Sequence, residues 1–181
     1  QSKKSITLED VYRFYRFFPL SVENLRSLEN GMEYTVLNQG KKIDKYSFES
    51  GVFLESVFDL NDLSGLPFQS FSGYEYSPDE TKILLTTARE NIYRRSYLAE
   101  FYIFDLKTGE VKPLSSAGKQ QLATFSPDGS MVAFVRNNNL YLTRLNSMKE
   151  QQITFDGKRN EIINGAPDWV YEEEFGFNKA F

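Results

Sequence analysis

The sequence predicts an all-β fold made of repeated four-stranded sheets, a partial β-propeller. Aromatic residues make up 15% of the chain, and most of them are Phe and Tyr, which favour strands. Turn signals recur at Asn30-Gly31, Asp79-Glu80 and Asp128-Gly129 at a constant spacing of 49 residues. The last two belong to a shared Ser-Pro-Asp phrase. A repeat of this length is typical of propeller blades, each of which holds four strands.

Composition excludes several classes of protein. The 181 residues are 40% hydrophobic and 25% charged, as in an ordinary soluble domain. A net charge of −4 argues against a nucleic-acid partner. The chain has no Cys and no His, which excludes disulfides, thiolate metal sites and a Ser-His-Asp triad within these residues. No cofactor and no metal are therefore expected.

The N-terminal part, residues 1–24, is predicted to be a short helix with a lead-in. Thr7 can cap a helix, and Asp10 follows three residues later, as in a capping box. The helix is expected over 8–16, to end before Pro19 and to pack its apolar stripe against the core. The stripe consists of Leu8, Val11, Tyr12, Tyr15 and Phe18.

Residues 25–181 are predicted to be the first blades of the propeller, because apolar runs alternate there with turn signals. In the first repeat the strands are expected at 33–37, 43–47 and 52–54. In the second repeat they are expected at 82–87, 100–105 and 110–114. In the third repeat they are expected at 121–125, 131–135, 140–145 and 152–155. Residues 177–181 are interpreted as the first strand of a fourth blade.

Two segments interrupt this pattern. We call residues 88–98 the basic insertion, because they carry Arg89, Arg94 and Arg95. We call residues 160–177 the acidic insertion; it is expected to be helical and carries three adjacent glutamates. Long connections on a regular scaffold are where binding residues tend to lie. Three blades and a fragment would leave an open sheet edge, so the chain is expected to be part of a larger polypeptide.

The acidic run Glu172-Glu173-Glu174 concentrates negative potential after an aromatic, mostly apolar stretch. A primary ammonium suits such a site, because it has three donors and no acceptor. The alternative is a solvated charge run at a helix N-terminus, which is common in proteins. The neighbouring Trp169 and Tyr171 are expected to pack the acidic insertion against the propeller rather than to contact a ligand.

The stretch from Asn164 to Glu174, with its phrase Asp-Trp-Val-Tyr-Glu-Glu-Glu, resembles the double-glutamate motif of the dipeptidyl peptidase IV family. The opening helix, the Ser-Pro-Asp blades and the Tyr93-to-Tyr97 segment resemble the N-terminal part of that family's propeller, in the same order. The resemblance implies an eight-bladed propeller followed by an α/β-hydrolase domain, which is not in this chain. It also implies removal of an N-terminal dipeptide whose second residue is Pro or Ala.

By motif position, the resemblance implies that Glu173 and Glu174 hold the free α-ammonium of the substrate. Arg94 would donate to a substrate carbonyl oxygen, and Glu172 would not be a direct ligand. Two buried carboxylates repel each other, and both a nearby arginine and an arriving ammonium relieve that repulsion. Fixing the N-terminus at a set distance from the nucleophile would make the site count two residues. Catalytic residues are expected outside this chain.

The expected partners are peptides with a free N-terminus and Pro or Ala in second place, the remaining blades, the hydrolase domain and a second copy of the enzyme. The lack of Cys fits a bacterial homologue, and the protein is expected to be exported to the periplasm or cell surface. Two alternatives stay open. One is a tripeptidyl peptidase of the same family, and the other is a non-catalytic propeller that binds a protein partner.

Overall fold

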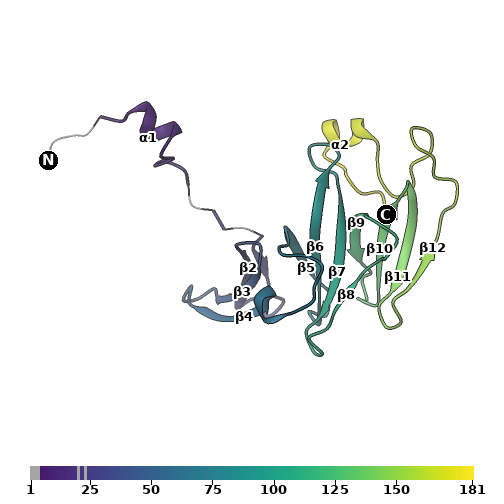
Figure 1. The fold of residues 1–181 in the computed structure, drawn as a ribbon, viewed down its shortest axis with the longest axis horizontal. Helices are drawn as coiled ribbons and strands as arrows, with labels where there is room; N and C mark the ends of the chain where they lie inside the picture. Colours follow the sequence, from purple (N-terminus) through teal and green to yellow (C-terminus); the bar gives the residue numbers. More distant parts are fainter. Residues whose placement is uncertain (1–4, 20, 23) are drawn as a thin grey trace.

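The computed structural model describes residues 5–19, 21–22 and 24–181, and it contains three four-stranded antiparallel sheets (Figure 1). In each sheet the strands follow one another in chain order, β1 to β4, β5 to β8 and β9 to β12. Neighbours in the sequence are therefore hydrogen-bonded neighbours in space. This arrangement confirms the partial β-propeller, and we call the sheets blades one, two and three.

The strands follow the predicted repeats, except that β4 runs to Asp59, five residues beyond its expected end at 54. Blade one contains β1 (Arg26–Ser27), β2 (Glu33–Asn38), β3 (Lys42–Ser47) and β4 (Phe53–Asp59), and the 3-10 helix η1 (Leu60–Asp62) follows it. Blade two contains β5 (Gly73–Tyr76), β6 (Lys82–Asn91), β7 (Tyr97–Asp105) and β8 (Val111–Pro113). Blade three contains β9 (Gln121–Phe125), β10 (Met131–Arg136), β11 (Asn139–Arg144) and β12 (Lys149–Gln152).

The Ser-Pro-Asp phrase forms the same turn in blades two and three. The Ser77 hydroxyl donates to Asp79 Oδ1 at 2.6 Å, and the Asp79 carboxylate also accepts from the backbone N–H of Thr81 at 3.2 Å. Asp128 accepts in the same way from the hydroxyl of Ser126 and the backbone N–H of Ser130. The hydroxyl bond, together with the other bonds within the turn, lowers the pKa of each aspartate to about 2.

Two apolar cores lie between the blades, and β6 contributes to both. Ile83 and Leu85 face blade one, where they pack with Phe58, while Leu84 faces the core shared with blade three. Successive side chains of a strand point to opposite faces of the sheet. The rest of the second core includes the fully buried Phe134. β7 alternates in the same way, with Tyr102 and Phe104 in the first core and Phe101 and Ile103 in the second, so blade two joins the other two blades through both of its central strands.

The structure also corrects one expected connection and two expected strands. β6 and β7 run through most of the basic insertion, so the connection between them is only residues 92–96 and not a long loop. β12 lies at Lys149–Gln152, three residues before the expected start, because the chain turns back at Met148 with a φ of 51°. Residues 177–181 form no strand, because no strand lies beside them for ladder hydrogen bonds among the described residues.

The N-terminal helix α1 (Leu8–Tyr12) has the predicted capping box of Thr7 and Asp10. It ends at Tyr12, seven residues before Pro19, and it stands apart from the sheets (Figure 1). The expected packing of its stripe against the core is wrong, because Leu8 and Tyr12 are each more than 70% exposed. None of the helices in the described residues has the length and apolar character needed to cross a bilayer.

Candidate functional site

The acidic insertion folds into the helix α2 (Trp169–Phe175), as predicted. The Asp168 carboxylate caps its start by accepting from the backbone N–H groups of Val170 at 3.0 Å and Tyr171 at 3.2 Å. Gly176 ends it in the left-handed conformation, with a φ of 71°, which glycine adopts without a steric cost. The length and position of α2 are therefore set by its two flanking residues.

Contacts with blade three hold the start of the acidic insertion. The backbone N–H and the side-chain amide of Asn164 both donate to the carbonyl oxygen of Asn138, at 3.0 and 3.1 Å. Gly165 packs so closely that a Cβ at its position would lie 2.8 Å from a methyl carbon of Val135. The carbonyl of Gly165 also accepts from the N–H of Ala180. The start of the segment that carries α2 is thereby bound to the turn between β10 and β11, and the end of the segment is bound to its start.

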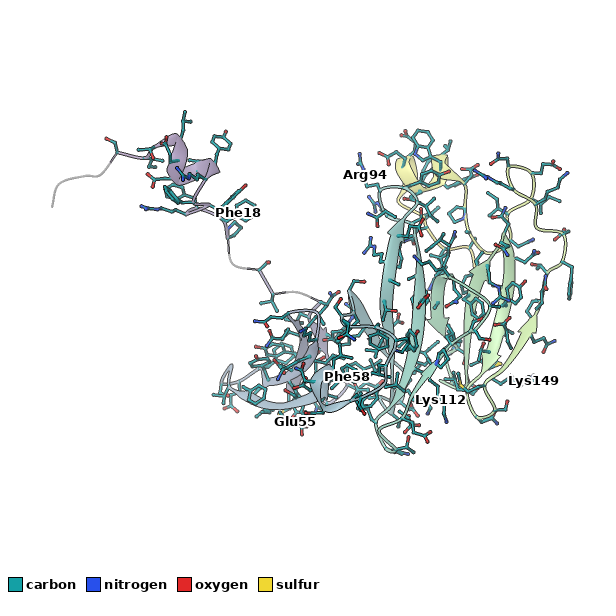
Figure 2. The ribbon with its side chains drawn as sticks, viewed as in Figure 1. Phe18, Glu55, Phe58, Arg94, Lys112 and Lys149 are labelled. Atoms are coloured by element: carbon teal, nitrogen blue, oxygen red, sulfur yellow. The ribbon has the colours of Figure 1, made fainter. Side chains whose placement is uncertain are left out.

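The basic insertion extends blade two as a hairpin whose tip, residues 92–96, reaches α2 (Figure 1). The pairing of β6 with β7 continues through a bulge between Thr87 and Glu90. At the tip, the N–H of Ile92 donates to the carbonyl of Ser96 at 2.9 Å. Figure 2 shows Arg94 at the outer end of this hairpin, beside the ribbon of α2.

Glu172 joins the two insertions from a buried position. Its side chain belongs to a residue that is only 3% exposed, and its Oε1 accepts from the backbone N–H groups of Arg95 at 2.7 Å and Ser96 at 3.0 Å. Burial raises the pKa of Glu172, but hydrogen bonds from Ser96 and Arg95 together outweigh burial and leave the pKa below its usual value. Glu172 therefore stays ionised near neutral pH.

The adjacent residues form the candidate site. A terminal guanidinium nitrogen of Arg94 lies 3.0 Å from Glu173 Oε1, with side chains that are 72% and 25% exposed. Glu174 is exposed, and among the described residues no Lys or Arg nitrogen lies within 4.0 Å of its carboxylate. The residues that the structure describes contain no cluster of His, Cys, Asp and Glu side chains that could hold a metal ion.

The structure thus brings two of the three predicted site residues, Arg94 and Glu173, into contact and places Glu174 next to them. Their roles as substrate ligands stay a prediction. The expected burial of both carboxylates is wrong, because Glu174 is exposed and the buried glutamate is Glu172. The hairpin tip covers only the side of α2 from which Glu172 projects.

The predicted packing of Trp169 and Tyr171 against the propeller is also wrong. The two residues are 49% and 51% exposed, and the ring of Tyr171 contacts that of Phe175, with centroids 5.7 Å apart. Residues four apart lie on the same helix face, so this aromatic pair is local to α2. The face opposite the hairpin thus carries apolar side chains that the described blades do not cover.

Comparison with known proteins identifies the family. A model of the dipeptidyl peptidase IV N-terminal region matches residues 77–181, which is more than half of the chain. The chain belongs to the dipeptidyl peptidase IV family. It is 40% identical over 140 residues to dipeptidyl-aminopeptidase B of Aspergillus niger, a match that covers 75% of this chain and 15% of the relative. It is 34% identical over 176 residues to human prolyl endopeptidase FAP, covering 94% of this chain and 22% of the relative.

A solved structure shows the same fold. The crystal structure of dipeptidyl peptidase 4 from Porphyromonas gingivalis superimposes with a TM-score of 0.88 at 40% sequence identity, covering 99% of this chain and 26% of that protein. The chain therefore spans about a fifth of the length of the relatives that it matches. This chain corresponds to the N-terminal region of dipeptidyl peptidase IV family proteins. The relatives named above are peptidases.

Sequence reasoning missed the part that Glu172 plays in the geometry. Its partners are backbone N–H groups 76 and 77 residues earlier in the chain, and every residue other than proline has such a group. The only available signal was the position of Glu172 directly before the predicted ligand pair.

Proposed function

We propose that this chain is the substrate-recognition part of a serine exopeptidase that releases X-Pro or X-Ala dipeptides from peptide N-termini. The observation that carries the proposal is the contact of Arg94 with Glu173 beside an exposed Glu174. It joins the basic and the acidic insertions, which are distant in sequence, into one charged site on a family scaffold whose named relatives are peptidases.

The charges of this site favour a free N-terminus. Arg94 offsets one of the two carboxylates, so Glu173, Glu174 and Arg94 together keep one unit of negative charge. An α-ammonium supplies one positive charge and three donors, which two carboxylates can accept together. An acetylated N-terminus has neither the charge nor the donors, so the site would reject it.

Arg94 has N–H donors that do not contact Glu173 and are available to bind the substrate backbone. A guanidinium has five N–H donors, and its side chain here is 72% exposed with one nitrogen on Glu173. In the proposal, a remaining N–H binds a carbonyl oxygen near the scissile bond. Holding the ammonium and this carbonyl together positions the bond for attack, and such proximity contributes much of the rate of a bimolecular step.

The chemical step belongs to the parts of the enzyme beyond these residues, since the chain has no histidine for a triad. The proposal therefore includes the remaining blades and an α/β-hydrolase domain, with a homodimer as the complete enzyme. Export to the periplasm or cell surface is part of the same proposal.

The test compares three chromogenic substrates with the complete polypeptide: Gly-Pro-p-nitroanilide, its N-acetylated form and Ala-Ala-Pro-p-nitroanilide. We expect cleavage of the free dipeptide substrate alone. In Glu173→Gln and Glu174→Gln, kcat/KM for that substrate should fall about 10- to 100-fold, because a hydrogen bond to a charged group contributes about 1.5–3 kcal/mol. Glu161→Gln, which changes an exposed carboxylate of the same insertion, is the matched control.

Each other outcome has a defined meaning. Cleavage of the tripeptide substrate alone would assign the chain to a tripeptidyl peptidase. Cleavage of none of the three would favour a non-catalytic scaffold. Equal cleavage of the free and acetylated dipeptide substrates, with both glutamine variants unimpaired, would contradict the proposal that Glu173 and Glu174 bind the α-ammonium.

A further inference from the structure

We propose that Glu172 is a positioning residue of this recognition site, which sets Arg94 against Glu173 by binding the backbone of the hairpin tip. The inference rests on the proposed function, since it concerns how the proposed ligands are held. Glu172 itself is buried, and its carboxylate faces the hairpin, so it does not contact substrate.

The residues that flank the two contacts are neighbours in the sequence. Glu172 directly precedes Glu173 on α2, and Arg95 directly follows Arg94 on the hairpin tip. Consecutive Cα atoms lie about 3.8 Å apart, so a contact that joins residues 172 and 95 leaves residues 173 and 94 little freedom. The Glu172–Arg95 hydrogen bond is 2.7 Å long, and the Arg94–Glu173 ion pair, at 3.0 Å, forms one residue later on α2 and one residue earlier on the hairpin tip.

The hairpin tip depends on Glu172 for its attachment. In the part of the chain that the structure describes, the polar contacts of the tip with α2 are the two bonds to Glu172 and the Arg94–Glu173 pair. The Arg94 side of the ion pair is largely exposed to solvent, and solvent-exposed pairs contribute about 0–1 kcal/mol. The bonds to the buried carboxylate are charge-assisted, short and shielded from water, and such bonds are the stronger kind.

The geometry requires the length of glutamate as well as its acceptor atom. A single oxygen, Oε1, receives both N–H groups, so the amide oxygen of glutamine could accept the same two bonds. Aspartate keeps the charge but is one methylene shorter and would not reach. On the other side of the contact, Gly176 admits the guanidinium of Arg95, because a Cβ there would lie 3.2 Å from it. The length of the Glu172 side chain and the close approach of Arg95 to Gly176 together hold the tip on α2.

The test measures kcat and KM for Gly-Pro-p-nitroanilide in the complete polypeptide. We expect Glu172→Asp and Glu172→Ala to lower kcat/KM about tenfold to 100-fold, since a misplacement of about 1 Å can cost that much. Glu172→Gln should stay within about threefold of the unchanged protein. The double variant Glu172→Asp/Arg94→Ala should lose no more kcat/KM than Arg94→Ala alone, because the effects of residues that act together are not additive.

A second measurement separates positioning from folding. Amide hydrogen exchange should be faster at Arg95 and Ser96 in Glu172→Asp, while the exchange of core amides in β7 stays unchanged. Glu161→Ala should alter neither the exchange nor the kinetics. Faster exchange in β7 as well would mean that Glu172 stabilises the whole blade, and it would overturn the positioning role.

The two proposals can fail separately. Normal kinetics in Glu172→Asp, beside impaired Arg94→Ala and Glu173→Gln variants, would refute the role of Glu172 and leave the recognition site intact. Full additivity of Glu172→Asp with Arg94→Ala would also refute it. If Arg94→Ala and Glu173→Gln were both unimpaired, the proposed function itself would fail.

Discussion

Replacing Gly165 with alanine should loosen the acidic insertion from blade three. Gly165 has a φ of +79°, a conformation that costs other residues about 1–2 kcal/mol. The new Cβ would also lie 2.8 Å from a methyl carbon of Val135 and 3.2 Å from one of Leu140, and overpacking of this kind costs about 1–3 kcal/mol. The combined cost is about 2–5 kcal/mol of local stability.

Two other glycines separate these contributions. Gly51 has a similar φ of +67°, but a Cβ at its position would meet no atom within 4 Å, so Gly51→Ala should cost only the backbone strain. Gly157 has no positive φ, yet its Cβ would clash with the carbonyl group of Asn138, so Gly157→Ala should cost only the clash. Gly51→Ala is thus the matched control for Gly165→Ala.

Amide hydrogen exchange in the complete polypeptide reports these local free energies, because segments open with their own stabilities. Exchange across residues 160–181 should speed up about tenfold for each 1.4 kcal/mol lost in Gly165→Ala. In Gly51→Ala, amide exchange in the hairpin around residue 51 should speed up less than exchange across residues 160–181 does in Gly165→Ala. If Gly165→Ala loosened its segment no more than Gly51→Ala loosens its own, the contact with Val135 would not hold the insertion.

Two further predictions concern the blades. Asp79 and Asp128 have pKa values of about 2 in the folded chain against 3.8 normally, so the stability that they contribute is complete above about pH 4 and is lost as the pH falls towards 2. The Tm difference between the unchanged protein and the Asp79→Asn/Asp128→Asn variant should therefore shrink over that range, and a constant difference would contradict the pKa assignment. Phe134→Ala should cost about 3–5 kcal/mol in urea unfolding, because the ring is fully buried against Tyr141; a cost below about 1 kcal/mol would mean that the core between blades two and three collapses to fill the cavity.

The blades were predictable because their signals are local. The turns at Asp79 and Asp128 are closed by hydrogen bonds within a few residues, and β5 and β6, which flank the first turn, pair without a register shift. The helix start at Thr7 is local in the same sense. Each of these features depends on neighbours in the sequence, so each is visible in the sequence.

The errors concern features that depend on distant partners. The stripe of α1 has helical spacing, but spacing does not tell which surface covers it. The bases for placing Arg94 near Glu173 were the family order and the opposite charges of the two insertions, whereas the contact itself depends on a hairpin that the sequence suggested was a loop. Glu172 is held in its buried position by backbone N–H groups, and the sequence does not show which of these groups will bind a given side chain.

The alternation of β6 limits how this chain can change in length over evolution. Inserting one residue between Lys82 and Thr87 would turn Leu84 towards the wrong core and would disturb both apolar layers at once. Inserting two residues would restore the faces and lengthen only the hairpin beyond the sheet. Natural variation in length within Lys82–Thr87 should therefore occur in steps of two residues, whereas the exposed extension beyond Thr87 lies outside both cores and is free of this restriction.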